Sequence, residues 1–401
     1  YPARLHVTDW IAGHTRNYQN VPLAEPDWTQ RLEFDETTIA EVLRARGYHT
    51  ASVGKWHLTP DAPAGSQEEM AYWPEHHGFD VNVGGNRWGQ PGKYFAPFSR
   101  SGLTMPNMPK AKEGAFLTDV LTDEVVRLIG DWKNGPFFIY LPYYTVHTPI
   151  QAKPELIEKY TPKVKANGRH RNATYAAMVQ SLDESVGRIW AALEAAGVAE
   201  NTLIILTGDN GGLDPEDKGA ITNNAPLRNG KGSVYEGGVR VPGVIKYPGG
   251  RRGAVETTPI ITMDFYPTIL NALNVPLPDL VLDGVDLSPL LKRDAKSLSP
   301  RDLFWHYPHY HTEGATPYSA IRSGDFRLVE YHVDGVVELY NLADDIGETH
   351  DLAAEMPAKA LELFQKLDAW RVSVGAQMAH ANPNYDPNKL SLTPRGGPLV
   401  R

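Results

Sequence analysis

Two oxygen-bearing side chains, Asp209 and Asn210, follow a continuous apolar run, 203–206, in the stretch Asn201–Gly212. The run is typical of a strand buried on both faces of a parallel sheet, and ligands of such sheets gather at the carboxyl ends of strands. A carboxylate beside an amide offers hard oxygens and one negative charge, which favours Ca²⁺ or Mg²⁺ over zinc. Calcium takes about six to eight oxygens, so further ligands must come from elsewhere. An ordinary Asx turn is the alternative interpretation.

Lys55 and His57 flank Trp56 at the end of a predicted strand, Tyr48–Gly54. In an extended segment, side chains two residues apart point to the same side. A cation and an imidazole on one face suit the binding of an oxyanion and a proton transfer. A salt-bridged lysine and a capping histidine are the structural alternative.

His147 and Lys231 are two further polar residues in loops. His147 follows a predicted buried strand, Phe137–Leu141, and Lys231 stands between glycines in the stretch Arg228–Gly232. Such a glycine-flanked loop could bring a cation close to a small anion, although its spacing is not that of a Walker phosphate loop. Taken singly, a structural histidine and an ordinary surface loop explain these two residues as well.

Predicted strands alternate with predicted helices over the first three quarters of the chain, which is typical of a mostly parallel α/β sheet flanked by helices. The pattern changes near 290–300, after which four short strands and one helix predict a small antiparallel sheet with a helix across it. We therefore expect a larger α/β domain at 1–297 and a smaller C-terminal subdomain with an extended tail at 298–401. The predicted helices are 38–47, 117–133, 175–193, 263–273 and 360–374, and the later strands are 239–247, 302–306, 318–322, 326–331 and 336–341.

Composition excludes several classes of protein. The chain carries 39 Lys and Arg against 48 Asp and Glu, a net charge of −9, which is not typical of a nucleic-acid binder. No apolar run is long enough to cross a bilayer. The chain has no cysteine, so disulfides, thiolate catalysis and cysteine-ligated zinc are excluded for these residues.

Several stretches, in this order, resemble the type I sulfatases of the alkaline-phosphatase superfamily: GYHTASVGKWHL, VHTP, TGDNGG and PLRNGKGSVYEGGVRVP. The later stretches AIRSGDFRLVE and ELYNLADDIGETHDLA resemble the C-terminal subdomain of the same family, and the resemblance extends from Tyr1 to about residue 390. It implies an arylsulfatase-like enzyme that hydrolyses sulfate monoesters to an alcohol and inorganic sulfate.

The resemblance also implies a role for each polar residue. Lys55 would contact the nucleophile and a sulfate oxygen, and His57 would act as the base when sulfate is expelled. His147 would protonate the leaving alcohol, and Lys231 would bind the sulfate at its bridging oxygen. Fixed cations and a proton donor are what the charge of such a transition state requires.

The same resemblance implies a formylglycine nucleophile, made from Cys or Ser, and a divalent cation, usually Ca²⁺, for which Asp209 and Asn210 match two ligands. The family's nucleophile motif, Cys/Ser-x-Pro-x-Arg, and an Asp pair lie upstream of the segment that corresponds to YPARLHVTDW. We therefore expect the nucleophile and the first strand before Tyr1, a formylglycine-generating system as a partner, and no turnover by residues 1–401 alone. By resemblance, the location is periplasmic or secreted.

Aromatic and histidine-rich loops supply candidate substrate contacts: His306 and His309 near the start of the C-terminal subdomain, and Arg87 and Trp88 in a glycine-rich loop. With an acidic net charge that is unsuited to gripping long polyanions, they favour a sulfated small molecule or the end of a sulfated glycan as substrate.

Two other functions remain open. The first is a phosphomonoesterase or phosphodiesterase of the same superfamily, which tends to present Asp-His where this chain has Asp209-Asn210. The second is a non-catalytic protein that binds sulfated glycans. Four retained residues argue against it: Lys55, His57, His147 and Lys231.

Overall fold

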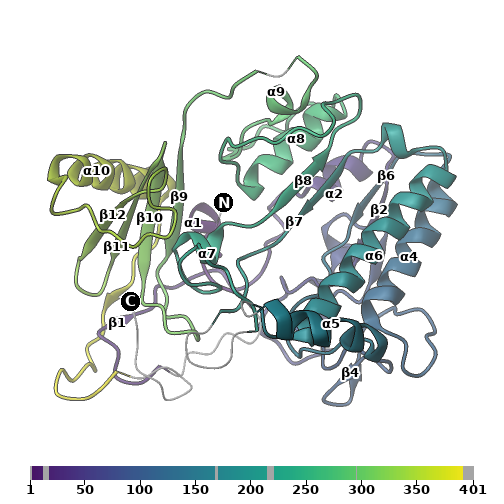
Figure 1. The fold of residues 1–401 in the computed structure, drawn as a ribbon, viewed down its shortest axis with the longest axis horizontal. Coiled ribbons are helices and arrows are strands. Elements are labelled where there is room, and N and C mark those ends of the chain that lie inside the picture. The colour runs from purple at the N-terminus through teal and green to yellow at the C-terminus, as the bar shows by residue number, and fades with distance from the viewer. Residues whose placement is uncertain (1, 12–17, 168–169, 215–220, 295, 392–401) are drawn as a thin grey trace. The chain divides into compact units, whose positions relative to one another are not determined.

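The computed structural model describes residues 2–11, 18–167, 170–214, 221–294 and 296–391 (Figure 1). The last ten residues of the predicted tail, 392–401, lie outside the described residues. The chain divides into two compact units: unit 1 comprises Tyr1–Asp9, Thr15–Thr29 and Leu203–Arg401, and unit 2 comprises Trp10–His14 and Gln30–Thr202. The predicted domains at 1–297 and 298–401 were drawn from the order of elements along the chain, and they stay a prediction.

Unit 2 is built around a three-stranded parallel sheet in the order β3-β2-β6. The central strand, β2 (His49–Val53), pairs with β3 (Val81–Val83) and with β6 (Phe137–Tyr140), and all of its residues after His49 are buried. Parallel strands need crossover connections, which here include the long helix α4 (Leu117–Trp132). This parallel sheet with helices confirms the predicted α/β class.

Helices of unit 2 form where local signals predict them. The helix α2 (Ile39–Arg44) begins with the predicted capping box: the Thr38 hydroxyl accepts the Glu41 N–H at 3.1 Å, and the Glu41 carboxylate accepts the Thr38 N–H at 2.7 Å. The helix α6 (Ala173–Ala195) lies beside α4 and α5 (Pro154–Asn167) in Figure 1. Among the described residues, none of the helices combines the length and the apolar character that a membrane span requires.

In unit 1, β7 (Ile204–Thr207) differs from its prediction. It pairs antiparallel with β8 (Gly243–Lys246), and Leu206 is 39% exposed. The prediction of a parallel strand buried on both faces is wrong for this element, because a two-stranded ribbon leaves part of each strand uncovered. The predicted strand 239–247 also starts later, since Glu236–Val239 form the helical turn α7.

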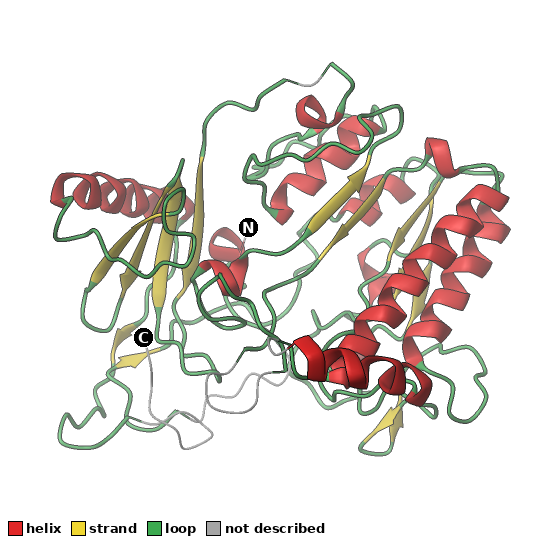
Figure 2. Ribbon diagram, viewed as in Figure 1, coloured by secondary structure: helices red, strands yellow, loops and turns green. Residues whose placement is uncertain are grey.

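The C-terminal part of unit 1 contains the predicted four-stranded antiparallel sheet, in the order β12-β11-β10-β9. Figure 2 shows the helix α10 lying across this sheet. One face packs Leu328 and Leu339 against Leu363 and Leu367 of that helix. The other face packs against Val234 and Tyr235. The strands are β9 (Asp302–Tyr307), β10 (Tyr318–Ser323), β11 (Phe326–Tyr331) and β12 (Val337–Asn341), and the helix is α10 (Pro357–Val374).

Short elements connect these parts. In unit 1 they are α1 (Pro2–Leu5), β1 (Leu23–Ala24), η3 (Thr262–Asp264), α8 (Phe265–Ala272), α9 (Ser288–Leu291) and β13 (His380–Ala381). In unit 2 they are α3 (Gln67–Met70), η1 (Pro74–His77), β4 (Ser99–Arg100), β5 (Leu103–Thr104) and η2 (Ala199–Asn201). The predicted helix at 263–273 is therefore divided between η3 and α8.

Two neutral histidines lie in a hydrogen-bonded chain on the C-terminal sheet. His306 Nε2 lies 2.7 Å from the Gln377 carbonyl oxygen and must donate to it, so His306 Nδ1 accepts from the Ser319 hydroxyl at 2.8 Å. The same hydroxyl then accepts from His332 Nε2 at 2.9 Å. Burial lowers the pKa of His306 to about 4 and the pKa of His332 to about 3.

Because these two histidines are neutral in the folded protein, we predict that the free energy of unfolding decreases as the pH falls. The unfolded histidines take up protons below about pH 6.5 while the folded ones stay neutral, so stability is lost as the pH falls from there toward about 4. His306→Gln keeps one donor and one acceptor without titrating. Relative to the wild type, we expect it to retain up to about 3 kcal/mol more of its neutral-pH stability at pH 4.

Urea unfolding at several pH values measures this difference. His350→Gln, at a histidine whose side chain is 64% exposed, is the control. An identical pH dependence for the wild type and His306→Gln would contradict the assignment of His306 as a buried neutral group.

Candidate functional site

Three loops of unit 2 meet at the carboxyl edge of its parallel sheet. The loop after β2 carries Lys55 and His57, and it is joined to its neighbours by backbone hydrogen bonds. The Lys55 N–H donates to the Pro142 carbonyl after β6 at 2.8 Å, and the His57 N–H donates to the Asn86 carbonyl after β3 at 2.9 Å. Lys55 and His57 therefore lie at the edge of the sheet where ligands of α/β proteins gather.

The backbone at His57 is not extended. Its φ is 62°, in the left-handed region that residues other than glycine rarely adopt. β2 ends at Val53, and Trp56, between the two polar residues, is 8% exposed and donates its indole N–H to the Tyr72 carbonyl at 2.9 Å. The expectation of strand alternation for Lys55 and His57 is wrong, because the chain has already left the sheet. A strained histidine held in place by its surroundings is typical of functional sites.

His147 is held in the loop that follows β6. Its Nδ1 lies 3.0 Å from the Thr148 carbonyl oxygen and 3.2 Å from the Thr148 hydroxyl. A ring that donates its Nδ1 proton to this carbonyl exchanges its other proton at Nε2. The hydroxyl of Tyr94, which is fully buried, lies 2.6 Å from the Tyr144 carbonyl and 2.9 Å from the His147 carbonyl. Burial raises the pKa of Tyr94, so this hydroxyl stays a donor. The sequence gives no spacing signal for Tyr94, which lies far from His147 along the chain.

Arg87 and Trp88, two predicted substrate contacts, both bind neighbouring residues of the chain. The Arg87 guanidinium forms an ion pair with Asp61 and also contacts the Ala62 carbonyl. Trp88 is 6% exposed, and its N–H donates to the Asn86 side chain at 2.9 Å. These contacts order the loop after β3, and the predicted role of the two residues in substrate binding stays a prediction.

In unit 1, backbone hydrogen bonds join two loops. We call residues 208–212 the strand-end loop and residues 228–238 the Lys231 loop. The Lys231 N–H donates to the Gly212 carbonyl at 3.0 Å, and the Gly211 N–H donates to the Gly238 carbonyl at 2.8 Å. The structure thus brings the segment with Asp209 and Asn210 together with the segment that carries Lys231.

The glycines beside Lys231 are required by this close approach. A Cβ atom at Gly230 would lie 2.2 Å from the Gly212 carbonyl oxygen. Gly232 has a φ of +88°, and a Cβ atom there would lie 2.3 Å from Nδ1 of His311. Larger residues at these two positions would push the Lys231 loop away from its neighbours.

The side chains of Asp209 and Asn210 leave oxygen atoms for a ligand. The Asn210 N–H donates to Oδ1 of Asp209 at 3.0 Å, and the Asn210 amide donates to the Gly211 carbonyl at 2.8 Å. With its NH₂ group engaged, Asn210 presents Oδ1 as an acceptor. Across the described ranges no cluster of three or more His, Asp or Glu residues could hold a metal ion. The predicted binding of a hard cation by this pair, with further ligands from elsewhere, stays a prediction.

His306 and His309 are both buried. His306 belongs to the hydrogen-bonded chain on the sheet, and Nε2 of His309 lies 2.7 Å from the Thr8 hydroxyl. Their predicted contact with substrate stays a prediction, as do the predicted roles of Lys55, His57, His147, Lys231, Asp209 and Asn210.

Comparisons with known proteins show the family. The profile of the family described as Sulfatase matches residues 12–275, and that described as N-sulphoglucosamine sulphohydrolase, C-terminal, matches residues 229–372. A sulfatase of Formosa agariphila is 34% identical over an alignment 411 positions long, and the match covers 88% of this chain and 73% of that protein. Human arylsulfatase A is 29% identical over an alignment 385 positions long, and the match covers 84% of this chain and 70% of that protein.

A solved structure shares the fold of this chain. The structure of Ps i-CgsB in complex with k-i-k-neocarrahexaose has a TM-score of 0.73 and 28% sequence identity, and the match covers 92% of this chain and 79% of that one. The stretches that carry Lys55, His147, Asp209 and Lys231 all lie within the matched family profile. On these grounds, the chain belongs to the sulfatase family of sulfuric ester hydrolases.

Proposed function

We propose that this sulfatase hydrolyses carbohydrate sulfates to the free sugar hydroxyl and inorganic sulfate. The observation that carries the proposal is the pair of backbone hydrogen bonds between the strand-end loop and the Lys231 loop. These bonds bring the segment with the oxygen ligands, Asp209 and Asn210, together with the segment that carries the cation, Lys231. A sulfate monoester is a small anion that needs such a cation. The relative Ps i-CgsB, whose structure contains a neocarrahexaose, supports a sugar as the substrate.

A divalent cation is part of this proposal. Asp209 and Asn210 would hold Ca²⁺, or Mg²⁺, because both ions prefer oxygen ligands and the metal-binding atoms of both side chains are oxygens. When bound, the cation would withdraw negative charge from the sulfate oxygens. By the same proposal, the nucleophile is a formylglycine made by a formylglycine-generating system, and the protein is periplasmic or secreted.

The chain's own residues would bind the anion and move protons. Lys55 and Lys231 would hold sulfate oxygens, and His57 would accept a proton when sulfate is expelled. His147 would donate a proton from Nε2 to the leaving alcohol, since the Thr148 carbonyl that accepts from Nδ1 also stabilises the charged imidazolium. Each role is the one that the resemblance to type I sulfatases implies for that residue, and each residue type is chemically suited to it.

The substrate class is tested with the extended protein, which we define as residues 1–401 together with the upstream nucleophile segment. We expect sulfate release from a panel of sulfated mono- and oligosaccharides. Ion chromatography of released sulfate measures it, with matched phosphorylated sugars as the comparison. Activity confined to aryl or steroid sulfates would refute a carbohydrate substrate, and faster phosphate release would favour the phosphomonoesterase alternative.

The metal assignment predicts a change of preference in Asn210→His. An imidazole in place of an amide oxygen should weaken Ca²⁺ binding and strengthen Zn²⁺ or Mn²⁺ binding, each by about tenfold or more. Isothermal titration of the extended protein with each metal measures both constants. Asn223→His, at an asparagine outside both loops, is the control. If Asn210→His and the control bind Ca²⁺ as tightly as the wild type, Asn210 is not a ligand.

The acid role of His147 predicts a dependence on the leaving group. In the extended protein, His147→Ala should slow release from sugar hydroxyls by about 10²–10⁴-fold, because an alkoxide needs a proton in order to leave. Release from an activated phenol should change by about tenfold or less, since a phenolate leaves without one. The exposed His76→Ala variant is the control. Equal losses on both substrates would remove His147 from this role.

A further inference from the structure

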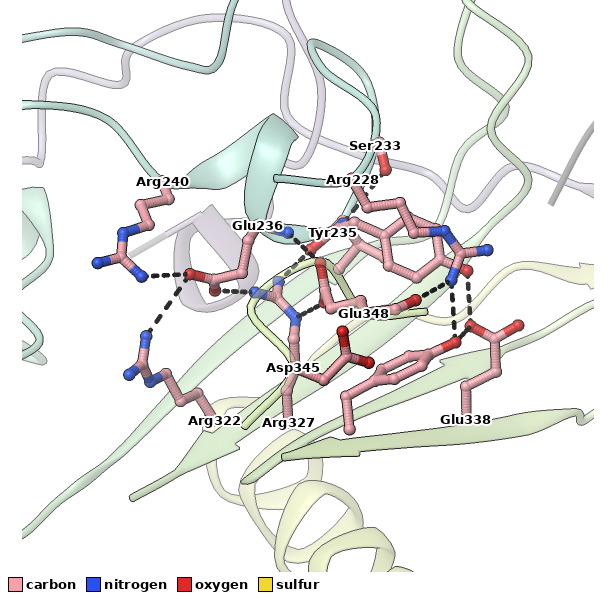
Figure 3. A network of polar contacts seen from close by, with 12 residues as sticks. Arg228, Ser233, Tyr235, Glu236, Arg240, Arg322, Arg327, Glu338, Asp345 and Glu348 are labelled. Atoms are coloured by element: carbon pink, nitrogen blue, oxygen red, sulfur yellow. Dashed lines mark hydrogen bonds and ion pairs between the residues drawn. The ribbon is translucent and has the colours of Figure 1, made fainter. Parts of the chain in front are cut away.

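The Lys231 loop packs against the C-terminal sheet through buried charges (Figure 3). Arg327 on β11 is fully buried, and its Nη1 donates to Oε1 of Glu236 at 2.5 Å. The same guanidinium contacts the Val234 carbonyl. Glu236 and Val234 both belong to the Lys231 loop, so Arg327 binds this segment through a side chain and through the backbone.

Glu348 holds the same end of the loop. Its carboxylate accepts the Glu236 N–H at 2.7 Å, and its other oxygen lies 3.5 Å from Nε of Arg327. The Glu348 side chain is fully buried, and its backbone has a φ of 50°, in the left-handed region. Desolvation raises the pKa of Glu348 to about 7. A strained backbone and a buried carboxyl group are both unfavourable, and here both serve the contact to the loop.

Arg228 fixes the opposite end. Its Nη1 lies 2.9 Å from the main-chain oxygen of Glu348 and 2.9 Å from the Tyr340 hydroxyl. The guanidinium stacks over the Tyr235 ring at 3.8 Å. The Gly237 N–H donates to the Arg228 carbonyl at 3.0 Å, which closes the loop on itself. The segment around Glu348 therefore contacts both ends of the loop whose middle carries Lys231.

Stability alone does not account for a network of this kind. A buried ion pair loses so much hydration that apolar residues of similar volume are often as stable. Directional hydrogen bonds do, however, fix where a backbone lies, and a cation that binds a small anion must be placed within a fraction of an ångström. The network meets the Lys231 loop at Val234, Glu236 and Arg228.

We propose that Arg327 and Glu348 are positioning residues for sulfate recognition: they hold the Lys231 loop in register with the strand-end loop, so that Lys231 reaches a sulfate bound beside Asp209 and Asn210. The inference rests on the proposed function of Lys231. It makes the C-terminal sheet part of the recognition apparatus rather than only a structural support.

The test compares Arg327→Met and Glu348→Ala with two matched variants of the extended protein. Glu348→Gln keeps an oxygen that accepts the Glu236 N–H. Arg371→Met breaks another ion pair of the same sheet, from Arg371, which is 8% exposed, to Glu330 at 2.5 Å on the face toward α10. For each protein we would measure kcat, KM, inhibition by inorganic sulfate, melting temperature and hydrogen exchange of residues 228–238.

We expect Arg327→Met and Glu348→Ala to raise the inhibition constant of inorganic sulfate about tenfold, to lower kcat/KM by about ten- to a hundredfold, and to accelerate hydrogen exchange of the Lys231 loop. Glu348→Gln should retain near wild-type values. Arg371→Met should lower the melting temperature without changing sulfate inhibition. If Arg371→Met weakens sulfate inhibition as much as Arg327→Met, the effect is general destabilisation and the proposal fails.

Hydrogen exchange separates this proposal from the proposed function. If the wild type releases no sulfate from any ester but Arg327→Met still accelerates exchange of residues 228–238 selectively, the function is wrong and the positioning of the loop stands. If sulfate release is observed and exchange of the loop is unchanged in Arg327→Met and Glu348→Ala, the positioning role is wrong and the function stands.

Discussion

Two backbone hydrogen bonds, from Lys231 to Gly212 and from Gly211 to Gly238, determine where the charged groups of unit 1 lie. Backbone groups cannot change rotamer, so the distance between the two segments is set by the chain rather than by flexible side chains. This close approach requires glycines, and a Cβ atom at Gly230 would collide with the Gly212 carbonyl. The glycine-rich sequence around Lys231 is therefore explained by packing.

The need to hold the Lys231 loop in place also explains why charged side chains gather where this loop packs against the C-terminal sheet. Arg327 on β11 pairs with Glu236 of the loop, Glu348 accepts the Glu236 N–H, and Arg228 of the loop donates to the main-chain oxygen of Glu348. Lys231 lies between the two ends of the loop that these contacts hold. The net charge of −9 disfavours the binding of long polyanions by the chain as a whole.

Local signals in the sequence predicted elements well and contacts poorly. The capping box at Thr38, the strand 326–331 and the long helix after residue 172 all depend on neighbours within a few residues, and all three formed. The antiparallel partner of β7 and the left-handed backbone of His57 depend on tertiary packing, and both differ from expectation. Arg327 and Glu236 are 91 residues apart in the chain. No periodicity links them, although a charged residue on the same buried face of β11 as Val329 and Tyr331 signals that an acidic partner must exist.

The most direct measurement is the position of a cation and a sulfate ester in a crystal structure of the extended protein, soaked with calcium and a sulfated oligosaccharide. Our account predicts a cation bound by oxygen atoms of Asp209 and Asn210, and a sulfate oxygen within about 3 Å of the Lys231 ammonium group. A sulfate group bound away from the Lys231 loop, with the cation on other ligands, would contradict it.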